Sequence, residues 1–165
     1  SRPGTALRHA ASWLLIFAGA VVLYGLSDQL ERQLMPTVAS RVDADTVALT
    51  RGPNGHFAVE LGIEGTAVEA LVDTGATELV LTKRDAARIG LDPGRLAYTR
   101  RAMTANGMVR GAPVRLSRVT IGPFELRDVP AVVNEGALHT SLLGMRVLDR
   151  FAGFEVRGDR MLIHR

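Results

Sequence analysis

A single aspartate stands between two apolar runs near the middle of the chain. The runs cover residues 70–72 (Ala-Leu-Val) and 79–81 (Leu-Val-Leu), and the segment Asp73-Thr74-Gly75-Ala76 begins the break between them. Apolar runs this short, on either side of a glycine-containing turn, are typical of buried strands. A carboxylate held between two buried strands costs free energy unless it is paired, hydrogen-bonded or functional. Asp73 is therefore the first candidate for a catalytic group.

A second short motif lies far downstream. Leu142, Leu143 and Gly144 form an apolar-apolar-glycine turn in front of a short predicted helix. Together with the Asp73 segment, this turn resembles the pattern of retropepsin-type aspartic proteases, in which such a turn packs beside the catalytic loop. The resemblance covers residues 46–165, about 120 residues. It implies a mainly β fold, with a retropepsin-like closed β-barrel (an acid-protease half) and short helices.

The resemblance also implies roles for the loop residues. Asp73 would be catalytic, and Thr74 would hydrogen-bond to its symmetry mate in a second copy of the chain. Gly75 would let two carboxylates approach closely and would supply backbone donors, and Ala76 completes the active-site loop. Two close carboxylates that share one proton can activate a water molecule and protonate the scissile carbonyl. This chemistry needs no metal and no cofactor, so we expect none.

The chain carries this motif once. No second Asp-Thr-Gly or Asp-Ser-Gly occurs, and Asp149 is followed by Arg150 in the predicted terminal helix. A domain of about 120 residues is also too short to hold two such lobes. We therefore predict a symmetric homodimer, because a two-fold axis brings the same residue of two copies together.

Residues 98–111 are predicted to form a β-hairpin, with Asn106-Gly107 as its type I′ turn. By the resemblance, this hairpin takes the position of the flap that covers the substrate. The flap candidates are Met103, Asn106, Gly107 and Met108. Ordinary packing against the core is the competing role for the two methionines.

The remaining pattern of the domain is mainly that of strands and turns. Period-two alternation is strict at residues 57–63, and a capping box at Thr82 and Asp85 predicts a helix over residues 83–89. For His139-Thr140-Ser141, just before the second motif, a position near the active-site turn and a surface loop are the two alternatives, and we favour the surface loop. Further strands are predicted at residues 46–50, 67–72, 79–81, 114–121 and 124–133, with a closing hairpin at 154–163.

The N-terminal segment has a different character. Residues 9–27 contain no Asp, Glu, Lys or Arg. A helix of that length would span about 28 Å, close to the roughly 30 Å hydrocarbon core of a bilayer. We therefore predict one transmembrane helix at residues 10–27, a stalk or linker at 28–45 and the protease domain at 46–165. A cleaved signal peptide and a buried globular helix are the two alternatives.

Charges around this segment predict its orientation. Arg2 and Arg8 precede it and Asp28 follows it, so the positive-inside rule makes residues 1–9 cytoplasmic. The protease domain would then be periplasmic, at a bacterial inner membrane crossed once. The expected partners are the lipid bilayer, through residues 10–27, and polypeptide substrates near the membrane.

Composition argues against several other classes of protein. Cysteine is absent, which excludes disulfides and cysteine-based metal or redox sites. Arginines are scattered and are not interleaved with aromatic residues, so nucleic acid is not an expected partner. The histidines have no metal-ligand spacing, and neither a Gly-x-Ser-x-Gly elbow nor a phosphate-binding glycine loop occurs.

The sequence thus predicts a membrane-anchored aspartic endopeptidase. Its catalytic Asp dyad would form across a homodimer, with water as the nucleophile. The alternative is a non-catalytic, membrane-tethered module of the same fold that binds peptides or drives dimerisation. A third interpretation, an arginine-rich nucleic-acid binder, would require steeply salt-dependent binding.

Overall fold

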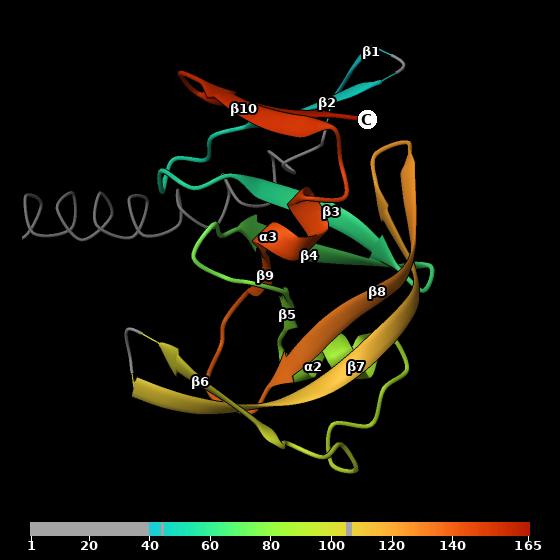
Figure 1. Cartoon of the computed structure of the whole chain (residues 1–165), viewed down its shortest axis with the longest axis vertical. Helices are drawn as coiled ribbons and strands as arrows, with labels where there is room; N and C mark the ends of the chain where they lie inside the picture. The colour runs from blue at the N-terminus through green and yellow to red at the C-terminus, as the bar shows by residue number, and fades with distance from the viewer. Residues whose placement is uncertain (1–39, 44, 105–106) are drawn as a thin grey trace, which may run out of the picture. The chain divides into compact units, whose positions relative to one another are not determined.

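The computed structural model describes residues 40–43, 45–104 and 107–165 (Figure 1). The predicted cytoplasmic segment 1–9, the anchor 10–27 and most of the predicted stalk lie outside the described residues. Within the described part of the chain, no helix is long and apolar enough to cross a membrane. The anchor, its orientation and the location of the domain therefore stay predictions.

Strands dominate the described part of the chain, which confirms the mainly β prediction. The two described helices are short. In chain order the elements are β1 (Ser40–Asp43), β2 (Thr46–Thr50), β3 (Ala58–Ile63), β4 (Thr66–Val72), β5 (Leu79–Leu81), α2 (Lys83–Arg88), β6 (Arg100–Thr104), β7 (Gly107–Ile121), β8 (Phe124–Asn134), β9 (Ser141–Leu143), α3 (Met145–Leu148), β10 (Gly153–Arg157) and β11 (Arg160–His164).

The larger sheet closes on itself, as the predicted barrel requires. Its strand order is β3-β4-β9-β5-β8-β7-β6, and β3 also pairs with β7, so six strands form a closed ring and β6 extends from it. Inward-facing residues alternate along the strands: Val59, Leu61 and Ile63 of β3 are all fully buried. This alternation is what a barrel with a side-chain-filled interior needs.

The smaller sheet has the antiparallel order β1-β2-β11-β10. Val47 of β2 and Ile163 of β11 are fully buried and belong to the same hydrophobic cluster as the barrel interior. Strand β1 lies within residues 28–45, which were expected to be a linker. Its sequence, Ser-Arg-Val-Asp, has one apolar residue and no periodicity, so only its pairing with β2 reveals it as a strand.

Two other boundaries differ from the sequence-based prediction. Strand β7 is continuous over 15 residues, whereas the sequence pattern predicts a hairpin that ends at residue 111 and a further strand from residue 114. The pairing of β6 with β7 ends at Gly111, so at Pro113 the strand β7 is paired with β8 on one side and has no strand on the other. A proline, which has no N–H to donate, is tolerated in a strand at such an edge. Helix α2 ends at Arg88, one residue early, and Gly90 follows with φ +90°, the left-handed conformation common after a helix.

Candidate active site

Strand β9 lies between the two strands that carry the Asp73 loop. It runs parallel to β4, which ends just before Asp73, and antiparallel to β5, which follows the loop. The Asp73 N–H donates a hydrogen bond to the Leu143 carbonyl at 3.0 Å, and the Met145 N–H donates to the Ala76 carbonyl at 2.9 Å. The structure therefore brings the two motifs of the sequence into direct backbone contact.

Gly144 allows this close approach. A Cβ atom at this position would lie 2.4 Å from the Glu78 carbonyl oxygen and 2.6 Å from the Ala76 carbonyl oxygen. Real Cβ atoms are essentially never found this close to another heavy atom, and the backbone of the loop cannot yield without losing its hydrogen bonds. The glycine of the downstream turn is thus required by the shape of the Asp73 loop.

The loop presents its polar groups at the surface. Asp73 is half-buried, and Thr74 and Gly75 are exposed. The Asp73 carboxylate accepts a hydrogen bond from the Gly75 N–H at 2.8 Å, and the Asp73 carbonyl accepts one from the Ala76 N–H at 3.1 Å. This tight turn leaves the acidic side chain partly exposed and holds it with a backbone donor.

The predicted flap hairpin is an arm formed by β6 and the first half of β7, which extends beyond the barrel in Figure 1. Met103 and Met108 are paired across it and are 75% and 60% exposed, so the packing role that competed for these methionines is wrong. Gly107 has φ +102°, a conformation that favours glycine. Asn106, the remaining flap candidate, lies outside the described residues.

A buried carboxylate that the sequence analysis missed links this arm to the loop. Glu78 is 8% exposed and directly precedes β5. It forms ion pairs with Arg100 at the start of β6 and with Arg146 of α3. One side chain therefore connects the end of the Asp73 loop, the base of the arm and the helix after Gly144. The one feature of the sequence that could have indicated this buried carboxylate is the position of Glu78 directly before the apolar run 79–81.

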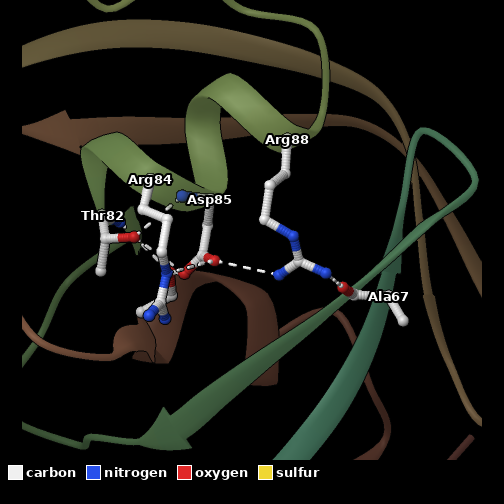
Figure 2. A network of polar contacts seen from close by, with 6 residues as sticks. Ala67, Thr82, Arg84, Asp85 and Arg88 are labelled. Carbon is white, nitrogen blue, oxygen red and sulfur yellow. Dashed lines mark hydrogen bonds and ion pairs between the residues drawn. The ribbon is translucent and has the colours of Figure 1, made fainter.

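A second buried carboxylate, Asp85 of α2, is the centre of the polar network in Figure 2. It is 1% exposed. Its Oδ2 accepts hydrogen bonds from the hydroxyls of Thr82 and Ser141, both at 2.8 Å, and its Oδ1 accepts one from Arg88 at 3.2 Å. Arg88 also donates to the Ala67 carbonyl at 2.8 Å. The network thus joins α2 to β4 and β9.

The charge state of Asp85 follows from these contacts. Burial raises the pKa of its carboxyl. Hydrogen bonds from Ser141, Thr82 and Arg88 and the nearby charge of Arg84 lower the pKa by more than burial raises it, so the pKa lies below the usual 3.8. Asp85 is therefore ionised at neutral and mildly acidic pH.

Ser141 corrects an interpretation made from the sequence. It was read as part of a surface loop, but it is fully buried and starts β9. Besides donating to Asp85, its hydroxyl accepts the Thr82 N–H at 3.2 Å. The capping box was predicted from Thr82 and Asp85 alone; Ser141 extends it to the strand that supports Asp73.

Among the residues that the structure describes, no group of three or more His, Asp or Glu side chains could hold a metal ion.

Comparison with known proteins places this arrangement in a family. Residues 59–150 match the family described as gag-polyprotein putative aspartyl protease. An uncharacterized protein of Rickettsia prowazekii is 33% identical over 161 residues, covering 93% of this chain and 69% of that protein. An uncharacterized protein of Sinorhizobium sp is 37% identical over 172 residues, covering 97% and 74%.

Solved structures give the same result. The crystal structure of a retropepsin-like aspartic protease from Rickettsia conorii has 38% sequence identity and a TM-score of 0.67, and the match covers 72% of this chain and 89% of that chain. The EIAV protease, solved with the inhibitor HBY-793, has 19% identity and a TM-score of 0.54, covering 66% and 99%. At that lower identity the likeness shows the fold alone.

Proposed function

We propose that this chain, which belongs to the retropepsin-like aspartic protease family, is an aspartic endopeptidase that acts as a homodimer. The observation that carries the proposal is the Asp73 loop, with its half-buried carboxylate, fixed from behind by Leu143 and Gly144. Family membership gives the class of reaction, and the loop gives the residue that would perform it.

The homodimer follows from the number of carboxylates. The reaction uses two close carboxylates that share a proton, and the chain has one Asp-Thr-Gly motif. A two-fold axis beside the exposed Thr74 and Gly75 would supply the second Asp73. Thr74 would then hydrogen-bond to its symmetry mate and hold the two loops together.

In this mechanism one Asp73 of the dimer is ionised and the other is protonated. The ionised carboxylate accepts a proton from a water molecule held between the pair, and the water oxygen attacks the scissile carbonyl carbon. The protonated carboxylate donates toward the carbonyl oxygen as the tetrahedral intermediate forms. The Gly75 N–H, which already donates to Asp73, would keep the carboxylate oriented throughout. The β6–β7 arm, with Met103 and Met108 exposed, would cover the substrate and exclude water.

The decisive experiment replaces one atom of the reactive group. Asp73→Asn should abolish peptide cleavage while leaving the far-UV circular dichroism and the association state unchanged. Asp149→Asn, the same change at an exposed aspartate after α3, is the matched control and should retain full activity. Undiminished cleavage by Asp73→Asn would remove Asp73 from the mechanism. A wild-type chain that binds peptides and releases them intact would favour the non-catalytic binding module.

We also propose that residues 10–27 anchor the chain in a bacterial inner membrane with the protease domain in the periplasm. The support is the charge-free segment 9–27 and the arginines that precede it. Anchoring would raise the effective concentration of the domain, favour pairing of two copies and present them to polypeptides near the membrane.

The absence of cysteine makes this orientation easy to test. A single cysteine at exposed Arg157 should react with a membrane-impermeant maleimide in intact spheroplasts. A single cysteine at Ser1 should react only after lysis. The reverse labelling pattern would contradict the orientation, and recovery of both variants in the soluble fraction would contradict the anchor.

A further inference from the structure

A surface cavity of about 280 Å³, open to solvent, lies where the end of the Asp73 loop meets the base of the β6–β7 arm. Three charged residues line it: Glu78, Arg100 and Arg115. Pro113 and Val114 of β7 and Pro130 and Ala131 of β8 form its apolar wall. Its volume is just below the roughly 300–1,000 Å³ of sites for whole drug-sized ligands, so it has room for a long side chain.

In the cavity, the carboxylate of Glu78 has a partner for each oxygen, whereas the guanidinium of Arg100 keeps free donors. Both carboxylate oxygens of Glu78 are already engaged, Oε2 by Arg100 and Oε1 by Arg146. Arg100 uses one terminal nitrogen for this contact, and half of its side chain remains exposed. An arginine has five N–H donors, so Arg100 keeps donors for a second acidic partner.

Arg115, on the other side of the cavity, is also available. Its ion pair with Asp128 is at 2.6 Å, but the two side chains are 65% and 68% exposed, and exposed pairs of this kind are weak. The residues that line the cavity include two arginines (Arg100 and Arg115) and one carboxylate (Glu78), which leaves one surplus positive charge. The cavity therefore favours an anionic group with a short aliphatic stem.

We propose that this cavity is a subsite that binds an acidic side chain of the polypeptide substrate, with Arg100 as the residue that determines the preference. The carboxylate of the substrate would accept hydrogen bonds from the remaining N–H groups of Arg100 and from Arg115. Its methylene groups would pack against Pro113 and Val114. The inference rests on the proposed protease function, because a substrate held between the Asp73 loop and the arm would run past this cavity.

The test uses pairs of peptides that differ by one charge. A peptide library cleaved by the full chain and analysed by mass spectrometry gives a substrate sequence. Glutamate or glutamine is then placed at each of the four positions on either side of the scissile bond. At one position, wild-type protein should cleave the glutamate peptide with about tenfold higher kcat/KM, the size of effect expected from one charge-assisted hydrogen bond.

Three arginine variants separate the subsite from general effects. Arg100→Gln should reduce the glutamate preference to about one, and Arg115→Gln, which leaves the Glu78 ion pairs intact, should reduce it in part. Arg127→Gln, which removes an exposed arginine of β8 that does not line the cavity, should leave it unchanged. The preference is a ratio measured on one protein sample, so a lower fraction of folded or dimeric protein does not alter it. A merely structural role of Arg100 would lower both rates and keep the ratio.

A binding measurement distinguishes failure of this inference from failure of the proposed function. Fluorescence anisotropy with the same labelled peptides and the Asp73→Asn protein gives a Kd ratio without turnover. A tenfold Kd ratio with no cleavage by wild-type protein would retain the subsite and refute the protease activity. Cleavage with a glutamate-to-glutamine ratio near one at every position, or a ratio that Arg100→Gln does not change, would overturn the subsite. Absence of any peptide binding would overturn it as well.

Discussion

Replacement of Asp85 by asparagine tests the polar network that joins α2 to the strands beside the Asp73 loop. The Asp85 carboxylate is buried and accepts hydrogen bonds from Thr82, Ser141 and Arg88. Asparagine has nearly the same shape, but it has no charge and one of its two polar atoms is a donor. If its oxygen faces Arg88, its amide nitrogen faces the two hydroxyls, which must then rotate to accept.

The expected cost can be estimated from these contacts. Hydrogen bonds to a charged group contribute about 1.5–3 kcal/mol, against about 0.5–1.5 kcal/mol for neutral pairs. Two hydroxyl contacts therefore lose roughly 2 kcal/mol together, and a hydroxyl hydrogen left without an acceptor adds about 1–2 kcal/mol. We expect Asp85→Asn to lower the free energy of unfolding by about 3 kcal/mol at pH 7, within a range of roughly 2–4 kcal/mol.

The pH dependence of this loss has a definite sign. The folded-state pKa of Asp85 lies below its usual value of 3.8, whereas the unfolded chain titrates near that value. The stabilisation by ionised Asp85 is therefore fully present above about pH 5 and is lost as the pH falls through the folded-state pKa. The difference between wild type and Asp85→Asn should be constant from pH 7 to pH 5 and should shrink at pH 3.

Urea unfolding followed by far-UV circular dichroism at pH 7, 5 and 3 measures this difference. Asp92→Asn is the matched control, because Asp92 is exposed and pairs with the exposed Arg95, and it should change stability by less than about 1 kcal/mol. A loss below about 0.5 kcal/mol for Asp85→Asn at pH 7 would refute the reasoning, as would a loss that grows toward pH 3.

Three other predictions concern the turn, the arm and the chemistry. Gly144→Ala should abolish cleavage and destabilise the domain by at least about 3 kcal/mol in urea unfolding, because the added Cβ would overlap backbone atoms of the Asp73 loop; wild-type activity would contradict this packing. Gly107→Ala should lower the free energy of unfolding by about 1 kcal/mol in the same assay, because the φ of +102° strains an alanine even though no atom lies within 4 Å of the new Cβ. Gly153→Ala is the control: the position is equally open but has no positive φ, so the change should be near neutral. Cleavage should survive an excess of a metal chelator, and loss of activity with recovery on adding a divalent metal would contradict a purely carboxylate mechanism.

Local patterns account for what could be predicted from the sequence. The strands around Asp73 were recognisable because short apolar runs flank a glycine turn, and the cap of α2 because Thr82 and Asp85 are three residues apart. The contact between the Asp73 loop and Gly144 came from the family resemblance. The structure adds its physical reason, a backbone approach that excludes a Cβ.

Long-range pairing accounts for what could not be predicted. Ser141 meets Asp85 across 56 residues and Arg146 meets Glu78 across 68, and no periodicity encodes such partners. Strand β1 is also invisible to pattern analysis, because its hydrogen bonds to β2 rather than its residue types make it a strand. The exposure of Met103 and Met108 reverses the packing that methionine usually favours, since every residue of β6 is exposed and neither face of the strand is covered.

The central claim, that two copies of Asp73 form one active site, has a direct test. Wild-type and Asp73→Asn chains are co-expressed in equal amounts, purified together and assayed at the same total concentration as wild type alone. Random pairing leaves about one quarter of the dimers with two aspartates, so the account predicts about one quarter of the wild-type activity. An activity of about one half would show that each copy acts alone and would contradict the shared site.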